Sequence, residues 1–196
     1  MAQTLELDYR VAPQSNLDPR TDQELVAQIN SGDHEAFEAL YFRYRDWVAA
    51  LSYRITGDSD AALDVLQETF LYVLKKFPGF RLTANFKTFL YPAVRNLSIA
   101  ALTKAKRYQA TESELQQIET TPAREAFQTG TDDLEAVLAG LSEEHREVIL
   151  LRFVDGLSLA EISEAMSIPL GTVKSRLHHA LQTLRQDRRT REFFLE

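Results

Sequence analysis

The stretch from Leu157 to Leu181 constrains the fold of this chain most, because it holds one signal for a helix start and one for a helix end. Ser158 is followed three residues later by Glu161, a capping box in which each side chain satisfies an unpaired backbone donor of the other. Pro169 disfavours the helical conformation at the residue before it, so the first helix should end by about Ile168. A second helix begins at once, and the pattern predicts a helix-turn-helix.

The second predicted helix has an apolar face and a polar face. Its buried stripe should consist of Leu170, Val173, Leu177, Ala180, Leu181 and Leu184. The remaining faces carry Thr172, Lys174, Ser175, Arg176, His178 and His179. Basic side chains reach phosphates or guanine acceptors, and short hydroxyl side chains let a helix approach base edges. The pattern therefore suits a DNA major groove, but many basic surface helices bind nothing, and both interpretations stay open at this point.

Composition narrows the class of protein. The chain has 196 residues, of which 44% are apolar and 26% charged, as in a soluble globular protein of one domain or two small ones. It has no cysteine, which excludes disulfides, thiolate metal sites and cysteine nucleophiles, and its four histidines have no ligand-spaced partners. We therefore expect no metal, no cofactor and no enzyme activity. No apolar run reaches the length of a membrane span and the N-terminus lacks a signal-peptide core, so we expect a cytoplasmic protein without membrane insertion.

The net charge of −7 on its own argues against a nucleic-acid partner, because phosphate contacts supply most non-specific affinity. The distribution of charge reverses that argument. Residues 69–111 contain no Asp or Glu but eight Lys and Arg, and residues 166–191 contain six Arg and Lys against Asp187 alone. Acidic residues gather instead between Glu112 and Glu135. Two basic segments thus flank an acidic one.

The N-terminal half should be helical. From Thr21 to Leu51, aliphatic and aromatic residues recur every three or four positions, with a turn at residues 31–33, and Trp47 is expected in the core of this hairpin. A turn at residues 57–60 should cap the next helix. The apolar stripe of that helix is expected to contain Leu63, Val65, Leu66, Phe70, Val73, Leu74 and Phe77.

Cations alternate with aromatic rings from Lys75 to Tyr91. This combination suits single-stranded nucleic acid, since cations follow the backbone and rings stack on unpaired bases. Most of the rings must fill a core, and we expect one or two of them to be exposed. A further helix should run from about Phe86 to Lys106, and Pro92 should kink it or start a new one.

Two motif sets resemble the extracytoplasmic-function (ECF) family of bacterial RNA polymerase sigma factors. The segment 171–177, preceded by 141–153, is similar to sigma region four, and the segments 64–71 and 86–97 are similar to sigma region two. The resemblance implies an all-α fold of two small helical domains joined by a flexible acidic linker. It divides the chain into an N-terminal tail at 1–20, a region-two domain at 21–107, the linker at 108–131 and a helix-turn-helix domain at 132–191.

The resemblance also implies a function and the residues that serve it. Such a protein joins core RNA polymerase, recognises the −35 and −10 elements of promoter DNA to initiate transcription, and is held by an anti-sigma factor. At the −35 element the family pattern implies Lys174, Ser175, His178 and His179, to which the helix face adds Thr172 and Arg176. At the single-stranded −10 element the expected residues are Phe80, Arg81, Asn85, Lys87, Arg95 and Asn96. Asp64, Gln67 and Glu68 match the polymerase-docking helix of the family.

The chain departs from the family pattern in the second region-two motif. Phe89 stands where tryptophan is common, Pro92 replaces a basic residue, and Ala100 and Thr103 replace polar or charged ones. These changes leave two alternatives open. One is a sigma-like decoy that titrates an anti-sigma factor, although such decoys carry a receiver domain that this chain lacks. The other is a simple helix-turn-helix repressor, which leaves the segment 64–97 unexplained.

Overall fold

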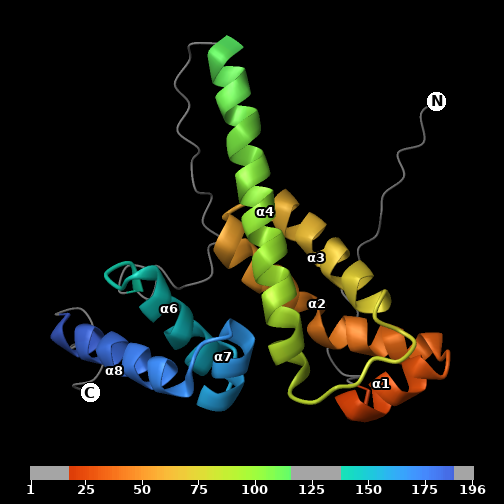
Figure 1. The fold of residues 1–196 in the computed structure, drawn as a ribbon. Helices are drawn as coiled ribbons and strands as arrows, with labels where there is room; N and C mark the ends of the chain where they lie inside the picture. The colour runs from red at the N-terminus through yellow and green to blue at the C-terminus, as the bar shows by residue number, and fades with distance from the viewer. Residues whose placement is uncertain (1–17, 116–137, 188–196) are drawn as a thin grey trace, which may run out of the picture.

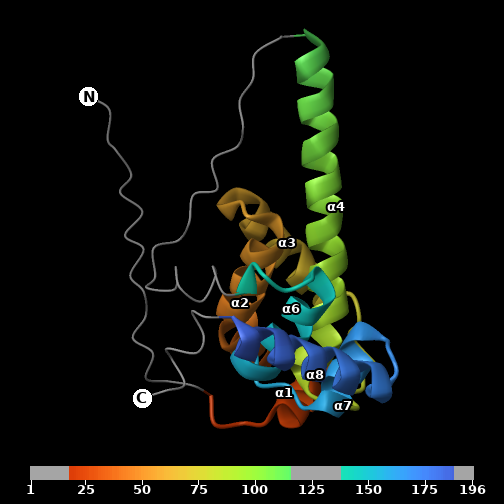
Figure 2. The same ribbon diagram turned by 90° about the vertical axis from the view of Figure 1, so that its left-hand side faces the viewer.

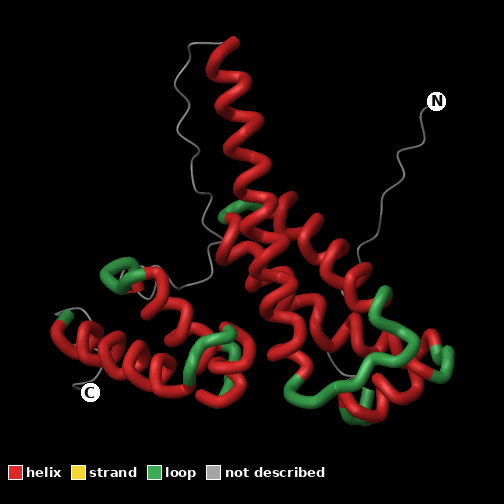
Figure 3. The backbone as a smooth tube through the Cα atoms, in the orientation of Figure 1, coloured by secondary structure: helices red, strands yellow, loops and turns green. Residues whose placement is uncertain are grey.

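The structure is a computed structural model that describes residues 18–115 and 138–187, with residues 108–115 described by their backbone only. Every regular element in these two ranges is helical (Figures 1 and 3), which confirms the all-α prediction. The elements are α1 (Asp22–Asn30), α2 (His34–Thr56), α3 (Ser59–Leu74), α4 (Phe86–Leu115), α6 (Glu143–Ile149), a π-helical segment (Leu150–Val154), α7 (Leu159–Met166) and α8 (Leu170–Gln186). Most of the predicted tail and residues 116–131 of the predicted linker lie outside the described residues.

Helices α1 to α4 form one bundle around an apolar core. Its fully buried side chains come from all four helices and include Leu25, Leu40, Val48, Val73, Phe86, Leu90 and Val94. The predicted helix ends are present. Thr21 and Glu24 form a capping box at α1, and Gly57 ends α2 in the left-handed conformation at φ 68° before Asp58 caps α3.

Helix α4 differs from the prediction in two respects. It continues through Pro92 without a break, so of the two outcomes expected there, a kink or a new helix, the new helix start is wrong. Proline removes one backbone hydrogen bond, and the burial of Leu90, Tyr91 and Val94 on both sides of it holds the helix together. The helix also runs beyond the expected end at Lys106 to Leu115, through a segment without glycine or proline. Its C-terminal part extends past the other helices (Figure 2).

Helices α6, α7 and α8 form the second domain, and its helix-turn-helix follows the predicted boundaries closely. Ser158 and Glu161 form the capping box at α7. The helix ends at Met166, Ser167 turns the chain in the left-handed conformation at φ 54°, and α8 begins directly after Pro169. Of the predicted stripe on α8, Val173 and Ala180 are buried, whereas Leu170 is 40% exposed. Leu170 is the first residue of α8, and the rest of the domain does not fully cover this end of the apolar stripe.

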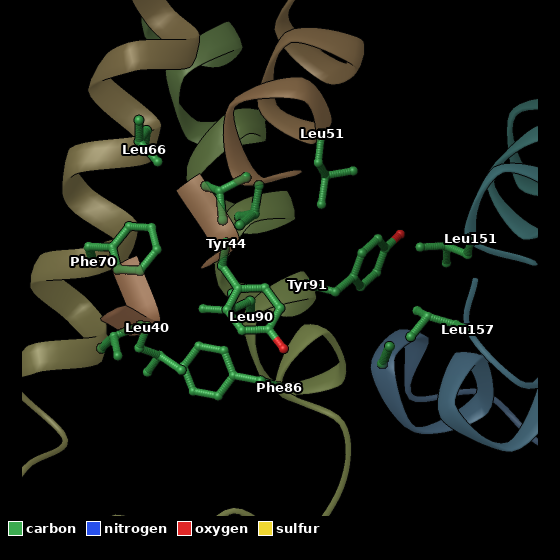
Figure 4. Close-up of a cluster of buried hydrophobic side chains, with 14 of the residues drawn as sticks. Leu40, Tyr44, Leu51, Leu66, Phe70, Phe86, Leu90, Tyr91, Leu151 and Leu157 are labelled. Carbon is green, nitrogen blue, oxygen red and sulfur yellow. The ribbon is translucent and has the colours of Figure 1, made fainter. Parts of the chain in front are cut away.

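The two domains pack against each other through a continuous apolar cluster. Leu151, Leu157 and Ile162 of the second domain are almost completely buried and belong to the same cluster as the core of the first. Figure 4 shows the ring of Tyr91, on α4, directed toward Leu151 and Leu157. The described structure is therefore compact across the domain boundary, and the helix-turn-helix is held against α4.

Loss of the capping box at α7 gives a first testable prediction. Ser158→Ala should lower the free energy of unfolding by about 1 kcal/mol, because the Glu161 backbone N–H loses its acceptor at 3.2 Å. Urea unfolding followed by circular dichroism measures the change. Ser175→Ala, an exposed mid-helix change on α8, is the matched control and should change stability by less than about 0.5 kcal/mol. Equal losses in both variants would contradict the capping assignment.

Candidate nucleic-acid interface

The outer face of α8 presents four of the six residues expected at the −35 element. Lys174, Ser175, His178 and His179 are all exposed. Thr172 is half-buried, and its carbonyl oxygen accepts a hydrogen bond from the Ser175 hydroxyl at 3.0 Å. The four exposed residues form a polar and basic helix face, which has the shape and chemistry that a major groove accepts.

Arg176 does not lie on this face, contrary to the expectation from the sequence. Its Nη2 forms an ion pair with Oε2 of Glu144 on α6 at 2.8 Å, and its side chain is only 20% exposed. Arg176 lies three residues after Val173 and four before Ala180, which places it at the edge of the buried stripe. The guanidinium therefore joins α8 to α6 within its own domain.

The residues expected to dock onto the polymerase lie together on the outer face of α3. Asp64, Gln67 and Glu68 are exposed, as the sequence predicts. The expectation that Leu63 and Leu74 belong to the buried stripe is wrong, because these side chains are 53% and 47% exposed. Leu71 and Tyr72 are exposed beside them at 56% and 38%. The apolar positions of α3 are too many for one buried side, so part of them faces outward.

A groove runs between α3 and α4 beside these residues. Its volume is about 360 Å³, and it is lined by Ala61, Asp64, Val65, Glu68, Leu97, Ala100, Ala101, Lys104 and Ala105. Ala100, one of the departures from the family pattern, therefore contributes to this groove. Small side chains form the walls, two carboxylates lie on the α3 side and Lys104 lies on the α4 side, so the groove is apolar with charged groups of both signs at its edges.

The aromatic rings of the basic stretch are more buried than the sequence suggested. Phe86 and Tyr91 are buried, and Phe77, Phe80 and Phe89 are half-buried, so the expectation of one or two exposed rings in this set is wrong. Phe80 packs against Phe77, Phe86 and Phe89 with ring centroids 5.5, 6.4 and 4.5 Å apart. Arg81, Asn85 and Asn96 are exposed.

Three of the six residues expected at the −10 element contact the second domain. Nζ of Lys87 donates a hydrogen bond to the backbone oxygen of Asp155 at 2.8 Å. Nε of Arg95 lies 2.9 Å from Oε1 of Glu147. The side chain of Asn85 lies close enough to Glu161 to contribute to the lowered pKa of that carboxyl. The structure thus brings half of the expected −10 set against carboxylates and a carbonyl of the helix-turn-helix domain.

Sequence reasoning missed the residue at the centre of this contact, Asp155. Its carboxylate is only 2% exposed, and its oxygens accept hydrogen bonds from Nε1 of Trp47 at 2.7 Å and Nη2 of Arg54 at 2.8 Å. Both partners belong to α2, about a hundred positions earlier in the chain. No periodicity or motif could indicate this pairing, because it is a contact between domains.

Tyr91 and Glu161 are among the titratable groups at the interface whose pKa values are shifted. Burial raises the pKa of the Tyr91 hydroxyl far above its usual range, and the neighbouring Glu147 carboxylate raises it further. The hydrogen bond from the Ser158 hydroxyl holds the pKa of Glu161 below its usual value, with smaller help from the Ser158 backbone and Asn85. Tyr91 therefore stays protonated as a donor to Glu147, and Glu161 stays ionised.

None of the helices in residues 18–115 and 138–187 has both the length and the apolar character needed to span a lipid bilayer. In the same two ranges, no group of three or more His, Asp or Glu side chains is arranged to hold a metal ion.

Comparison with known proteins identifies both domains. Residues 40–108 match the family model "Sigma-70 region 2", and residues 137–186 match "Sigma-70, region 4". Among solved structures, the chain is similar to the sigma factor RpoE in complex with the anti-sigma factor NepR from Bartonella quintana, with a TM-score of 0.58 and 25% identity over 76% of this chain and 94% of that one. It shares its fold with CnrH in complex with the cytosolic domain of CnrY, at a TM-score of 0.60, 22% identity, and coverage of 83% and 94%.

Curated relatives match along nearly their whole length. The ECF RNA polymerase sigma factor SigW of Bacillus subtilis is 31% identical over 177 residues, which cover 84% of this chain and 95% of SigW. The ECF RNA polymerase sigma-E factor of Escherichia coli K12 is 32% identical over 184 residues, which cover 84% and 92%. Together with the two matched regions, these similarities show that the chain belongs to the ECF family of RNA polymerase sigma factors.

Proposed function

We propose that this protein is an alternative sigma factor, a non-catalytic cytoplasmic subunit that brings core RNA polymerase to promoters and helps to open them. The observation that carries the proposal is the presence of both sigma regions in one chain, at 40–108 and 137–186. A repressor that used the helix-turn-helix alone would not need the first region. The matches support a region-two domain at 21–107 and a region-four domain at 132–191, and the first residues of the proposed linker at 108–131, as far as Leu115, continue helix α4.

For the −35 element we propose direct contact by the exposed face of α8. Lys174, Ser175, His178 and His179 supply the donors and the short side chains that such a contact needs. Thr172 is half-buried beneath Ser175 and contributes at the edge of the face. Arg176 pairs with Glu144, and we assign it an indirect role: it holds α8 in place against α6.

For the −10 element we propose that the surface around the N-terminus of α4 takes the separated strand. Arg81, Asn85 and Asn96 are exposed, and Lys87 and Arg95 add positive charge to the same surface. Phe80 is half-buried among other rings. It would therefore contact a base with the edge of its ring, or hold in place the residues that form the base pocket. The segment 69–111 contains no Asp or Glu that would repel the phosphates.

In vitro transcription with core RNA polymerase tests the function. Holoenzyme formed with this chain should initiate at discrete positions on a library of promoter fragments, and core polymerase alone should not. An anti-sigma factor, the third proposed partner, should abolish that initiation. A chain that binds an anti-sigma factor and core polymerase but opens no promoter would instead be a decoy, and one that binds DNA without polymerase would be a repressor.

Polymerase docking through α3 gives a second testable prediction. Replacing Asp64 and Gln67 together by alanine should weaken binding to core polymerase by about 1 kcal/mol or more, the cost expected when residues at the centre of an interface are truncated. The thermal midpoint should stay nearly constant, because solvated side chains contribute within about 0.5 kcal/mol. Fluorescence polarisation with core polymerase measures the first effect and calorimetry the second. Glu38→Ala, an exposed change on α2, is the control, and a large loss of stability with intact docking would favour a structural role.

A further inference from the structure

The side chain of Asn30 makes contacts that the proposed function leaves unexplained. Asn30 is the last residue of α1 and precedes the matched sigma region two, which begins at residue 40, yet it binds the chain fifty positions later. Its Oδ1 accepts hydrogen bonds from the backbone N–H of Gly79 at 2.6 Å and of Phe80 at 3.1 Å. Its Nδ2 donates to the backbone oxygen of Phe80 at 2.8 Å. One side chain therefore holds three backbone groups of the loop between α3 and α4.

The chemistry of an amide matches these three groups. An amide presents an acceptor and a donor side by side, and here the acceptor meets two N–H groups while the donor meets a carbonyl. A carboxylate at this position would lack the donor. An alanine would lack both the donor and the acceptor. Asparagine therefore satisfies all three backbone groups at once.

The loop has little else to hold its backbone in place. Among the residues that the structure describes, every hydrogen bond formed by the backbone of residues 78–84 comes from Asn30. The apolar part of the anchor is the ring of Phe80, which packs against Phe89 at 4.5 Å. A segment whose backbone has few hydrogen bonds opens at a low free-energy cost unless such contacts tie it down. Asn30 therefore supplies the polar part of that restraint.

The end of α1 that carries Asn30 is itself fixed in the bundle. Val26 and Ile29, on the last turns of α1, are buried in the core. At the other end of the helix, Asp22 forms an ion pair with Arg43 of α2 at 2.6 Å. A side chain that projects from a rigid helix positions its partner more precisely than one on a loop.

The loop segment held by Asn30 carries part of the proposed −10 surface. Phe80 itself and the exposed Arg81 directly after it belong to that surface. Asn85, at the far end of the loop, has a support of its own, because its Oδ1 accepts a hydrogen bond from the backbone N–H of Lys87 at 2.9 Å. Release of the Asn30 contacts would therefore displace Phe80 and Arg81 and leave Asn85 in place.

We propose that Asn30 is a positioning residue for −10 recognition, which acts by holding the Gly79–Phe80 backbone against the end of α1. The inference rests on the proposed sigma function. Asn30 acts through the loop and does not itself contact a base. A recognition loop that is ordered before binding accepts one geometry of the strand, whereas a loose loop adapts to several and loses free energy when it becomes ordered. Loss of Asn30 should therefore relax the base preference at the −10 element.

The test uses two substitutions of Asn30 and one control. Asn30→Ala removes all three hydrogen bonds. Asn30→Asp keeps an acceptor for the two N–H groups and removes only the donor to the Phe80 oxygen, so its effect should be intermediate. Gln23→Ala is the control, because it also removes an amide from α1 and Gln23 is exposed.

The first measurement is hydrogen exchange of the Gly79 and Phe80 amides in the full-length chain, followed by nuclear magnetic resonance. These two amides should exchange at least about tenfold faster in Asn30→Ala than in wild type, because their acceptor is lost and the loop opens more often. In Gln23→Ala they should exchange at the wild-type rate. Equal rates in wild type and Asn30→Ala would overturn the proposal.

The second measurement is in vitro transcription with holoenzyme on promoter fragments that share one −35 element and carry every single-base change in the −10 element. In Asn30→Ala, discrimination against the wrong base should fall about fivefold at one or two positions, the factor given by one hydrogen bond of ordinary strength. Discrimination at the remaining positions should stay as in wild type and in Gln23→Ala. A merely structural role would lower initiation on all fragments equally, and that result would overturn the proposal.

Two further outcomes are assigned in advance. If Asn30→Ala is too unstable to form holoenzyme, Asn30→Asp takes its place: relaxed preference at one or two positions supports the proposal, and wild-type preference overturns it. If wild-type holoenzyme initiates on no fragment, the sigma function fails and the positioning role fails with it. If wild-type holoenzyme initiates and all variants keep its preference, the positioning role fails alone.

Discussion

Phe86→Ala should lower the free energy of unfolding by about 3–5 kcal/mol, the range found when a buried aromatic side chain is removed from a core. Phe86 is 0% exposed at the first position of α4. Its ring packs against Tyr44 and Phe89 with centroids 5.0 and 5.6 Å away. The substitution removes contacts to α2 and to the loop before α4 at the same time. Urea unfolding monitored by circular dichroism measures the loss.

Phe42→Ala is the matched control for this prediction. Phe42 is an aromatic residue on α2, but it is 49% exposed and lies beneath the guanidinium of Arg45 at 4.9 Å. Its removal should cost about 1 kcal/mol or less, mainly through the lost cation contact. A loss in Phe42→Ala as large as that in Phe86→Ala would show that the core is organised differently.

A functional consequence follows from the place of Phe86 in the chain. The ring fixes the start of α4 and, through Phe80 at 6.4 Å, the loop that precedes it. Arg81, Asn85 and Lys87 all lie within a few residues of it, so the proposed −10 surface depends on this packing. At temperatures where the variant is still folded, its strand affinity should fall more than that of Phe42→Ala.

Local signals explain why so many helix ends could be predicted from the sequence. A capping box, a glycine in the left-handed region and a proline act within four or five residues of themselves, and this chain carries each of them. The boundaries at Thr21, Gly57 and Ser158 therefore follow from neighbouring residues alone. Pro92 shows the limit of such rules, because burial of the flanking residues outweighs the lost hydrogen bond.

The candidate sites could be predicted only in part, for a different reason. Periodicity gives the faces of a helix but not what covers each face. It placed Lys174 and Asp64 outward, as in the structure, yet it also placed Arg176 outward and Leu63 inward. Whether the side chains of Arg176 and Leu63 are buried or exposed depends on the neighbouring elements. Asp155 could not be predicted from any local sequence signal, because its hydrogen-bond partners belong to the other domain.

Lys174→Ala should weaken binding to a −35 duplex by about 1–3 kcal/mol if the ammonium contacts a base edge, and by less if it contacts phosphate alone. Lys174 is exposed on α8, one residue after the fully buried Val173 that anchors the helix. The loss should therefore come from the contact and not from the fold. Affinity should be measured by anisotropy with holoenzyme and duplexes selected for binding.

The salt dependence separates the two kinds of contact. A lost phosphate contact should lower the slope of log affinity against log salt by about 1 and weaken all sequences equally. A lost base contact should leave the slope nearly constant and relax the preference at one base pair. Gln182→Ala, an exposed change further along α8, is the control and should alter neither quantity. Unchanged affinity, slope and sequence preference in Lys174→Ala would remove Lys174 from the −35 site, and the face would then have to bind through Ser175, His178 and His179.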